Sequence, residues 1–411
     1  MTRRRVVVTG LGVVSPLGCE VQQVFDAAYR GESAIALVDL SSDTGSLQVP
    51  GAIVVGEPWR WLSNVPTPTC DRLSLMALAA SESALNDSGL DLARISPDRV
   101  GVSVGTSHGG ATSQEAAYAE IFSRKRSRLS PFTLVKVMYN GPAAQIALRH
   151  RLAGPALTYS TTCSSSAVSI GEAMRTIRHG YADVMVAGGA EAQFTYVSLV
   201  AWQALHVLAP VNQENVAASC RPFSRDRNGT VLGEGSAFVV LEEYEHAYRR
   251  GAKMYGELAG YASTNDFTHV TQPTLAGQSH AIRLALQDAS MPPISVDYIN
   301  AHGTGTRLND STETSAIKEV FGNHSRRLSI SSTKAAHGHL VGAAGALEFV
   351  LSAMTLQCQR VPPTAHLRIA DPECDLDFVP NVGRTQEVTT ALTSSFAVGG
   401  TAAVLVVTRA V

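Results

Sequence analysis

Three side chains have the chemistry of a nucleophile and of its hydrogen-bonding partners, and each stands beside glycine or other small residues. Cys163 lies in a run of hydroxyl residues (TTCSSS), His302 precedes an alternating glycine and threonine run (GTGT), and His339 follows a glycine. A thiolate attacks carbonyl carbon, and an imidazole N–H stabilises negative charge on oxygen. A single cysteine is more often inert and buried, and a single histidine is more often structural. The set of three, with glycines that leave room for a substrate, favours a catalytic site.

The elements around Cys163 are predicted to place it at a helix terminus. Residues Ala156–Tyr159 (ALTY) are rich in strand-forming types. After the cysteine, apolar residues recur at helical spacing, at Ala167, Ile170, Met174 and Ile177. A tight turn between this strand and helix leaves Cys163 at or just before the first helical turn. There, unpaired backbone N–H groups and the helix dipole stabilise a thiolate, which predicts a depressed pKa and an exposed sulfur atom.

The chain from Tyr255 onward repeats the organisation of the first part, which indicates an internal duplication. A predicted strand at Leu328–Ser332 leads to His339 and then to a helix of small residues at Val341–Met354, as the strand before Cys163 leads to its helix. Each part also has a glycine pair beside apolar runs, at Gly188 and Gly189 and at Gly399 and Gly400. Strands that alternate with helices predict a layered α/β fold with an N-terminal half (1–250) carrying the cysteine and a C-terminal half (251–411) carrying the two histidines.

The composition is that of a globular enzyme with no general affinity for polyanions. The chain has 411 residues, of which 45% are hydrophobic and 17% are charged, and its 33 basic residues nearly balance its 35 acidic ones. This balance gives no reason to expect a nucleic acid or an anionic membrane as a partner. The N-terminal strand is broken by Gly10, Gly12 and Pro16, so it is too short for a signal peptide or a membrane span. Six scattered cysteines predict a reduced, cytoplasmic protein without structural zinc: Cys19, Cys70, Cys163, Cys220, Cys358 and Cys374.

One short segment concentrates positive charge. Arg124, Lys125, Arg126 and Arg128 occupy four of five consecutive positions. Such a run is usually a solvated face, but in a chain so close to neutral it is also the best candidate for docking an acidic partner.

Five motifs resemble those of one enzyme family, the β-ketoacyl-acyl carrier protein synthases of the type that elongates acyl chains in type II fatty acid and polyketide assembly. They are TTCSSS (Thr161 to Ser166), AHGTGT (Ala301 to Thr306), STKAAHGH (around Lys334 and His339), GAAGALE (Gly342 to Glu348) and FAVGGT (Phe396 to Thr401). Their order and spacing are similar to the family from Arg4 to Val407, which is essentially the whole chain.

The resemblance implies a thiolase-like five-layered αβαβα fold made of two similar halves, a dimer, and a decarboxylative Claisen condensation. Cys163 would accept the acyl group, and His302 and His339 would stabilise the enolate formed from a malonyl group on the acyl carrier protein. Further implied roles are a charged pair behind His339 (Lys334 and Glu348), oxyanion-binding N–H groups (Cys163 and Val398), and pantetheine contacts (Thr304 and Thr306). The only prosthetic group implied is the phosphopantetheine of the carrier protein, with no metal, nucleotide or flavin.

Four positions depart from the family pattern. Val398 and Thr230 stand where relatives usually have aromatic residues, His108 stands where many have an aliphatic residue lining the acyl pocket, and His337 replaces a small or apolar residue. The expected substrate-binding residues are Thr304 and Thr306 together with Val398, Thr230, His108 and Phe396. The departures are either neutral or fit a specialised acyl group, polyunsaturated or more polar than a saturated chain.

Two related functions fit the sequence less well than a condensing enzyme does. A degradative thiolase uses a second cysteine as its base, but none of Cys220, Cys358 or Cys374 lies in a glycine-rich loop. A chain length factor, the inactive partner of a ketosynthase, lacks the nucleophile that is present here. The sequence leaves two alternatives open: a homodimeric fatty acid enzyme, and the active ketosynthase subunit of a heterodimer with a chain length factor in a polyene-type pathway.

Overall fold

The computed structural model describes residues 3–42, 45–64 and 67–410, and its main sheet has ten strands in two five-stranded parts. The first part has the order β5-β4-β6-β8-β1, with β1 (Val6–Val14), β4 (Val100–Gly105), β5 (Ala156–Tyr159), β6 (Val184–Glu191) and β8 (Gly235–Glu243). The second has the order β11-β10-β14-β15-β9, with β9 (Gly256–Asn265), β10 (Tyr298–Asn300), β11 (Ser329–Ser331), β14 (Thr390–Phe396) and β15 (Thr401–Thr408). The parts join where Val7 and Val8 of β1 pair with Glu257 and Gly256 of β9.

The two parts of the sheet share one topology. Counted along the chain, each has the strand order third, second, fourth, fifth, first. In each, the first three strands of that order run parallel, and the last two are antiparallel to their neighbours. The two parts therefore repeat one arrangement of strands, and the division of the chain at residue 250 stays a prediction.

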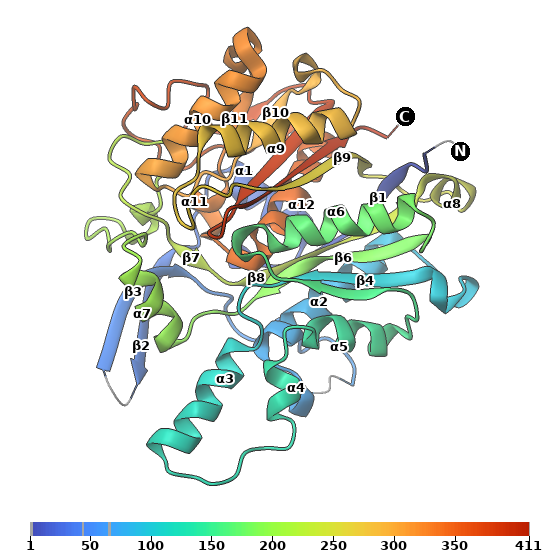
Figure 1. The fold of residues 1–411 in the computed structure, drawn as a ribbon, viewed down its shortest axis with the longest axis vertical. Helices are drawn as coiled ribbons and strands as arrows, with labels where there is room; N and C mark the ends of the chain where they lie inside the picture. The colour runs from blue at the N-terminus through green and yellow to red at the C-terminus, as the bar shows by residue number, and fades with distance from the viewer. Residues whose placement is uncertain (1–2, 43–44, 65–66, 411) are drawn as a thin grey trace.

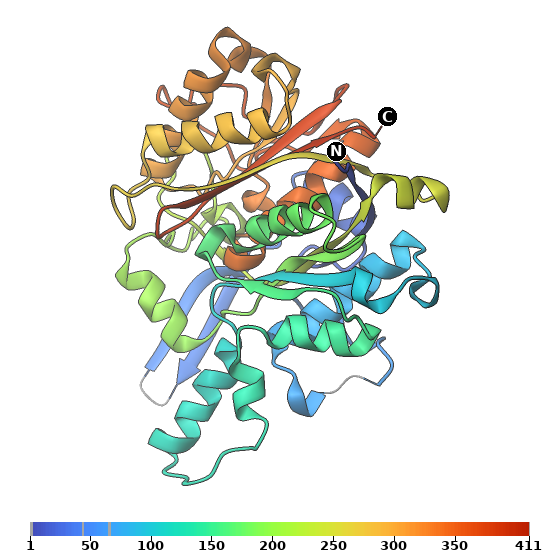
Figure 2. The same cartoon turned by 45° about the vertical axis from the view of Figure 1, so that its right-hand side comes forward.

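Helices and sheets alternate in five layers, as the family resemblance implied (Figures 1 and 2). The central layer contains α6 (Ser165–Arg178) and α12 (Ala344–Cys358), which pack between the two sheet parts. One outer layer, α2 (Arg72–Ser88) and α5 (Gly141–His150), covers the first part, and the other, α9 (Leu275–Asp288) and α10 (Arg307–Phe321), lies over the second.

The central helices approach closely because they are built from small residues. A Cβ atom added at Gly345 of α12 would lie 2.8 Å from the Cβ of Ala167 on α6. The stretch Val341–Cys358 is apolar and long enough to cross a membrane by composition, but 89% of it is buried inside the protein. Its uniform apolarity is therefore explained by its place between two sheets.

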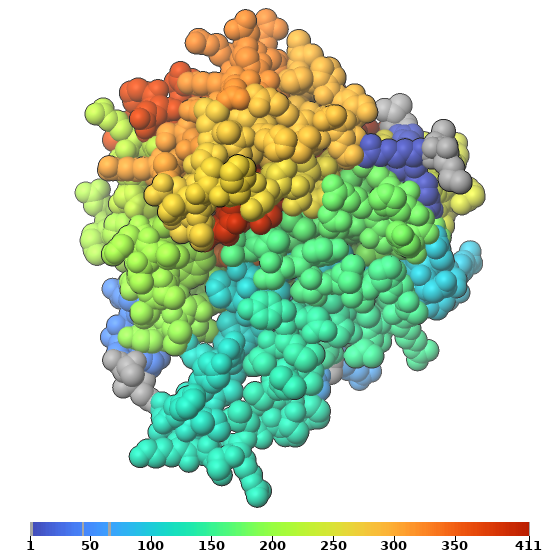
Figure 3. Space-filling view, viewed as in Figure 1, coloured from blue at the N-terminus to red at the C-terminus, as the bar shows by residue number. Residues whose placement is uncertain are grey.

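The remaining elements lie around the layers. An arm formed by α3 (Ala111–Tyr118), η4 (Ala119–Ser123) and α4 (Thr133–Val137) projects from the molecule (Figures 1 and 3). A small sheet of β2 (Ala36–Ser42), β3 (Gly45–Ala52) and β7 (Leu232–Gly233) lies beside α7 (Tyr196–Ala204). The other named elements are α1 (Val21–Tyr29), α8 (Tyr244–Arg249), α11 (Lys334–His337), β12 (Arg360–Val361) and β13 (Arg384–Thr385).

Candidate active site

Cys163 lies in a tight turn between β5 and α6, as its flanking residues predicted. The short helix η5 (Thr162–Ser164) contains the cysteine, and α6 begins at Ser165. The hydroxyl residues of the motif hold this turn: Ser164 Oγ donates to the carbonyl of Thr161 at 2.9 Å, and Ser165 Oγ accepts from the N–H of Thr161 at 2.9 Å. Serine and threonine are therefore used here to satisfy the backbone groups of a turn too tight for a regular ladder.

The predicted exposure and low pKa of Cys163 are wrong for the resting protein. Only 4% of the residue is exposed, and burial raises the pKa of its thiol to about 11. Lys334 and the backbone N–H groups of Val398 and of Cys163 itself act in the opposite direction, but they are outweighed. Desolvation penalises a thiolate more than the helix terminus stabilises it. Cys163 is therefore a neutral thiol in the resting protein. The N–H groups of Val398 and Cys163 stabilise negative charge that develops beside the sulfur during a reaction.

This protonation state predicts how alkylation of Cys163 depends on pH. With a thiol pKa of about 11, the thiolate fraction increases about tenfold for each pH unit between pH 7 and 9. The rate of iodoacetamide addition at Cys163, followed by peptide mass mapping against the Cys163→Ala protein, should increase in the same proportion. A rate that becomes constant near pH 7 would instead support the depressed pKa expected from the helix terminus alone.

His339 presents an N–H group towards the site. Its backbone N–H donates to the carbonyl of Val231 at 2.7 Å, and its Nδ1 accepts from the N–H of Val341 at 3.3 Å. Because Nδ1 is an acceptor, the ring proton lies on Nε2, which is buried and has no hydrogen-bond partner among the described residues. Burial, followed by the charge of Lys334, holds the pKa of His339 well below its usual value. His339 is thus a neutral Nε2–H donor with an open position in front of it.

His302 lies in the loop between β10 and α10, and its ring faces that of His339. The backbone N–H groups of His302 and Gly303 donate to the two carboxylate oxygens of Glu313 on α10, at 2.7 and 2.8 Å, and this fixes the loop after β10. The ring centroids of His302 and His339 are 5.5 Å apart and the rings are nearly perpendicular. Burial lowers the pKa of His302 well below its usual value, with Lys334 and His339 adding to the effect. Both histidines are therefore neutral at physiological pH.

Lys334 and Glu348 form a fully buried ion pair behind the histidines. Burial raises the pKa of Glu348 to about 7, and the ammonium group of Lys334 opposes that rise. The positive charge of Lys334 is also a cause of the lowered pKa of both histidines. His337, one of the departures from the family pattern, is buried beside this pair, donates from Nδ1 to the carbonyl of Gly338 and accepts at Nε2 from Thr333 Oγ1.

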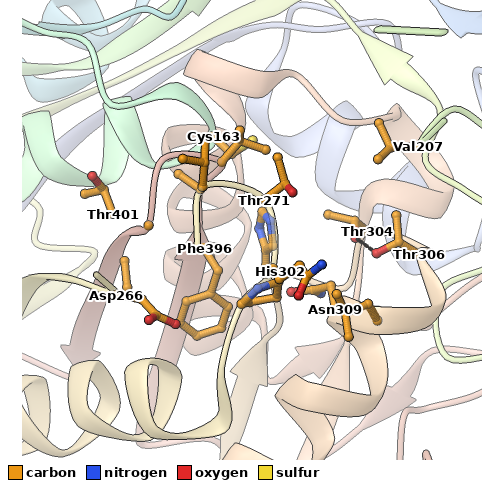
Figure 4. A pocket seen from close by; sticks show the side chains of 18 of the residues that line it. Cys163, Val207, Asp266, Thr271, His302, Thr304, Thr306, Asn309, Phe396 and Thr401 are labelled. Atoms are coloured by element: carbon orange, nitrogen blue, oxygen red, sulfur yellow. Dashed lines mark hydrogen bonds between the residues drawn. The ribbon is translucent and has the colours of Figure 1, made fainter. Parts of the chain in front are cut away.

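Cys163, His302 and His339 line a cavity of about 180 Å³ (Figure 4). Of the expected substrate-binding residues, five line it: Thr230, Thr304, Thr306, Phe396 and Val398. The hydroxyl groups of Thr304 and Thr306 face each other at 3.0 Å, and Phe396 packs edge-on against His302 at 5.9 Å between centroids. The accessible walls are mostly apolar, which suits a thioester chain.

His108 is the expected substrate-binding residue that lies outside this cavity. It does not line the cavity with the other predicted residues, but its ring lies 6.5 Å from that of Trp202, which does. Trp202 and a loop between β9 and α9 (residues 266–273) were not identified from the sequence, although both contribute to the lining. The loop carried no distinctive motif. Trp202 comes from α7, whose Leu199 belongs to the same apolar cluster as Cys163, and this placement had no local sequence signal.

The predicted docking cluster lies on the projecting arm and is partly neutralised. Arg124 and Arg126 both pair with Glu120, while Lys125 and Arg128 form no ion pair within the described residues. Because Glu120 compensates part of the charge, the free positive charge of the arm is smaller than the run of four cations suggested.

The donor atoms of Cys163, His302 and His339 lie within 4.8 Å of one another. The thiol of the first half and the two imidazoles of the second half therefore meet at one position. A substrate bound there can place a carbonyl carbon against the sulfur and a neighbouring oxygen atom against the two rings. The same spacing is also one that could hold a metal ion.

Comparisons with known proteins agree with this arrangement. The family model described as β-ketoacyl synthase, N-terminal domain, matches residues 3–247, and that of the C-terminal domain matches residues 255–368. The chain is 41% identical over 402 residues to nodulation protein E of Rhizobium meliloti (98% of each chain) and 38% identical over 403 residues to 3-oxoacyl-[acyl-carrier-protein] synthase 2 of Synechocystis (97% of each).

Solved structures give the same result. One is a type II polyketide synthase acyl-carrier protein in complex with its ketosynthase bound to the hexaketide (TM-score 0.90, 33% identity, 100% of both chains). Another is the ishigamide ketosynthase/chain length factor (TM-score 0.92, 31% identity, 100% of both chains).

Proposed function

Because the chain belongs to the β-ketoacyl synthase family, we propose that Cys163, His302 and His339 catalyse the decarboxylative condensation of an acyl group with malonyl-acyl carrier protein. The chain is a condensing acyltransferase of the 3-oxoacyl-[acyl-carrier-protein] synthase type, and it acts in fatty acid or type II polyketide synthesis. The observation that carries the residue assignment is the convergence of one thiol and two neutral imidazoles within 4.8 Å at the inner end of an apolar cavity.

The first half-reaction transfers the acyl group to Cys163. The sulfur attacks the thioester carbonyl carbon, the bond to the pantetheine sulfur breaks, and the thiol proton leaves with the released pantetheine thiol. The N–H groups of Cys163 and Val398, which lie against the sulfur, stabilise the oxyanion that forms on the carbonyl oxygen.

The second half-reaction uses the two histidines. Loss of CO₂ from the malonyl group leaves an enolate, whose oxygen accepts hydrogen bonds from His339 Nε2–H and from His302. The enolate carbon then attacks the acyl carbonyl on Cys163, the bond from that carbon to the sulfur breaks, and the released thiolate takes up a proton from solvent. Two preorganised donors in a dry site stabilise such an enolate by several kcal/mol, which is enough to direct the loss of CO₂. Burial keeps both rings neutral, and the positive charge of Lys334 adds to this effect.

All groups in this scheme are supplied by the chain and by carrier-bound pantetheine, so the proposal includes no metal, nucleotide or flavin. Residues 1–250 supply the nucleophile and residues 251–411 the two donors. A cytoplasmic location belongs to the same proposal, and the six free cysteines are consistent with a reducing compartment.

A second protein chain is the expected partner of the sheet edge at β5. Ala156 and Leu157 on this edge strand are exposed, and an unpaired edge is a template for pairing. The arm adds exposed apolar residues, among them Phe122 at 74% and Leu134 at 69% exposure. These surfaces support a dimer, formed either with a second copy or with a chain length factor.

The proposal is tested by mixing the purified chain, alone and co-expressed with a candidate chain length factor, with acyl- and malonyl-loaded carrier protein. We expect 3-oxoacyl-carrier protein and CO₂ in equal amounts. Product from the chain alone identifies a homodimeric enzyme, whereas product only after co-expression identifies the heterodimer. No product in either case, with a carrier protein shown to be loaded, would refute the assigned reaction.

Charge reversal of the arm should weaken carrier-protein binding. Replacing Arg124, Lys125, Arg126 and Arg128 with glutamate should raise KM for the carrier-bound substrate about tenfold, with a smaller effect on a short pantetheine mimic. The double change at Lys125 and Arg128 should account for most of this effect, because Glu120 already neutralises part of the other two. The difference should shrink with salt. Equal losses on carrier and mimic would assign the cluster a structural role.

A wider cavity entrance is the expected consequence of valine at position 398. Valine has a single stiff rotamer and much less bulk than phenylalanine, so Val398→Phe should slow loading of long, rigid or polyunsaturated acyl groups more than loading of a short saturated one. Because Thr230 lines the same cavity, adding Thr230→Phe should give a more than additive effect. Loading rates across a panel of acyl carriers measure this, and an unchanged preference profile would show that the substitution is neutral.

A further inference from the structure

The loop that carries the second oxyanion donor contains two consecutive glycines. It joins β14 to β15 through Ala397, Val398, Gly399 and Gly400, closed by a 2.8 Å bond from Ala397 N–H to the carbonyl of Thr401. Gly399 and Gly400 both have positive φ, at 100° and 85°, so their backbone has wide conformational freedom. The side chain of Val398 is too small to hold the loop by packing as an aromatic would. Something else must keep its N–H beside Cys163.

A hydroxyl group next to the nucleophile holds this loop. Thr162 Oγ1 lies 2.6 Å from the carbonyl oxygen of Val398 and 2.8 Å from that of Thr161, so its proton lies between two acceptors. Thr162 has φ of 49°, a left-handed conformation that is uncommon for a β-branched residue and strains its backbone. The strained backbone and the interaction across 236 positions of sequence occur at the same residue, directly before the cysteine.

The opposite side of the loop is bound to the wall of the cavity. Gly399 N–H donates to the carbonyl of Val270 at 2.7 Å, and Asp266 N–H donates to that of Gly400 at 2.7 Å. Both Asp266 and Val270 line the cavity. The loop is therefore held between the nucleophile turn and the 266–273 loop, and Thr162 provides the hydroxyl contact on the nucleophile side.

We propose that Thr162 is a positioning residue, whose hydroxyl fixes the carbonyl of Val398 so that the N–H of Val398 stays directed at the acyl oxygen on Cys163. The proposal rests on the function assigned above, because it requires an oxyanion at that place. The carbonyl of Val398 belongs to the peptide group that it shares with the Gly399 N–H, and Thr162 and Val270 bond to the two sides of this group. Fixing this peptide group limits rotation about the backbone bonds of Val398, and so limits the directions in which the Val398 N–H can point. Catalytic donors must hold their place to within a fraction of an ångström.

The test compares Thr162→Val, which keeps the shape and loses the hydroxyl, with Thr162→Ser, which keeps the hydroxyl. For single-turnover acylation of Cys163, we expect the valine protein to lose about 10- to 100-fold in rate with little change in the concentration of carrier at half-maximal rate. The serine protein should remain within about threefold of wild type. Thr162→Ala, which removes the hydroxyl together with the β-branched strain, should be as slow as the valine protein.

The outcomes separate this proposal from the function on which it rests. If wild-type protein is not acylated at Cys163, the assigned function fails whatever the variants do. If wild-type protein is acylated and the valine and alanine proteins match it, Thr162 does not position the loop. A slow valine protein with a fast alanine protein would identify a steric effect and would also overturn the proposal.

Discussion

Replacing Cys163 with alanine should abolish acyl loading and condensation, with a loss of at least about 10³-fold, and leave the fold intact. The sulfur is buried among the small apolar cluster around Leu232 and Val341, and its removal leaves only a small cavity, at a cost of about 1 kcal/mol. Intact mass measures the loss of acyl loading, and thermal unfolding measures the loss of stability.

A matched control is available in the same half of the chain. Cys220 is equally buried, and burial raises the pKa of its thiol to about 12. It does not line the cavity. Cys220→Ala should therefore keep acyl loading while causing a similar loss of stability. Acyl addition to another cysteine in the Cys163→Ala protein would show that the nucleophile is assigned wrongly.

Removing either histidine should separate the two half-reactions. His302→Ala and His339→Ala should still acylate Cys163, because the oxyanion donors are backbone N–H groups, but each should lose about 10²- to 10³-fold in malonyl decarboxylation. The control is His324→Gln, since His324 Nε2 lies 2.8 Å from the carbonyl oxygen of Val296 and the residue does not line the cavity. CO₂ release from malonyl-carrier protein measures the step.

The pH dependence of this step follows from the lowered pKa of both rings. Because each histidine is neutral well below pH 6.5, decarboxylation by wild-type protein should not fall between pH 8 and pH 6 through histidine protonation. A histidine variant that decarboxylates at the wild-type rate would contradict the enolate-stabilising role.

The sequence predicted the local elements of the site closely because those elements depend on neighbouring residues. The strand before Cys163 is found at Ala156–Tyr159 as predicted, and the strand predicted at Leu328–Ser332 is one residue shorter at each end. The helix predicted from Val341 begins with a 3₁₀ turn and continues as α12 to Cys358. Glycine positions and apolar spacing encode these features directly.

Properties that depend on distant packing were not predictable in the same way. The raised pKa of Cys163 results from burial by both halves of the chain, and no local pattern reports that burial. The contact of Thr162 with Val398 joins residues 236 positions apart. Glu120, which neutralises two arginines of the arm, precedes them in a segment whose π-helical turn had no sequence signal.

The most direct test of the account is the intact mass of the protein before and after each substrate. Exposure to a panel of acyl carrier proteins should add the mass of one acyl group at Cys163, mapped by peptide analysis, and the mass added identifies the preferred substrate. Subsequent addition of malonyl-carrier protein should remove that mass and release one CO₂ per acyl group. An acyl group that is found elsewhere, or that stays on Cys163 while CO₂ is released, would contradict the proposed condensation.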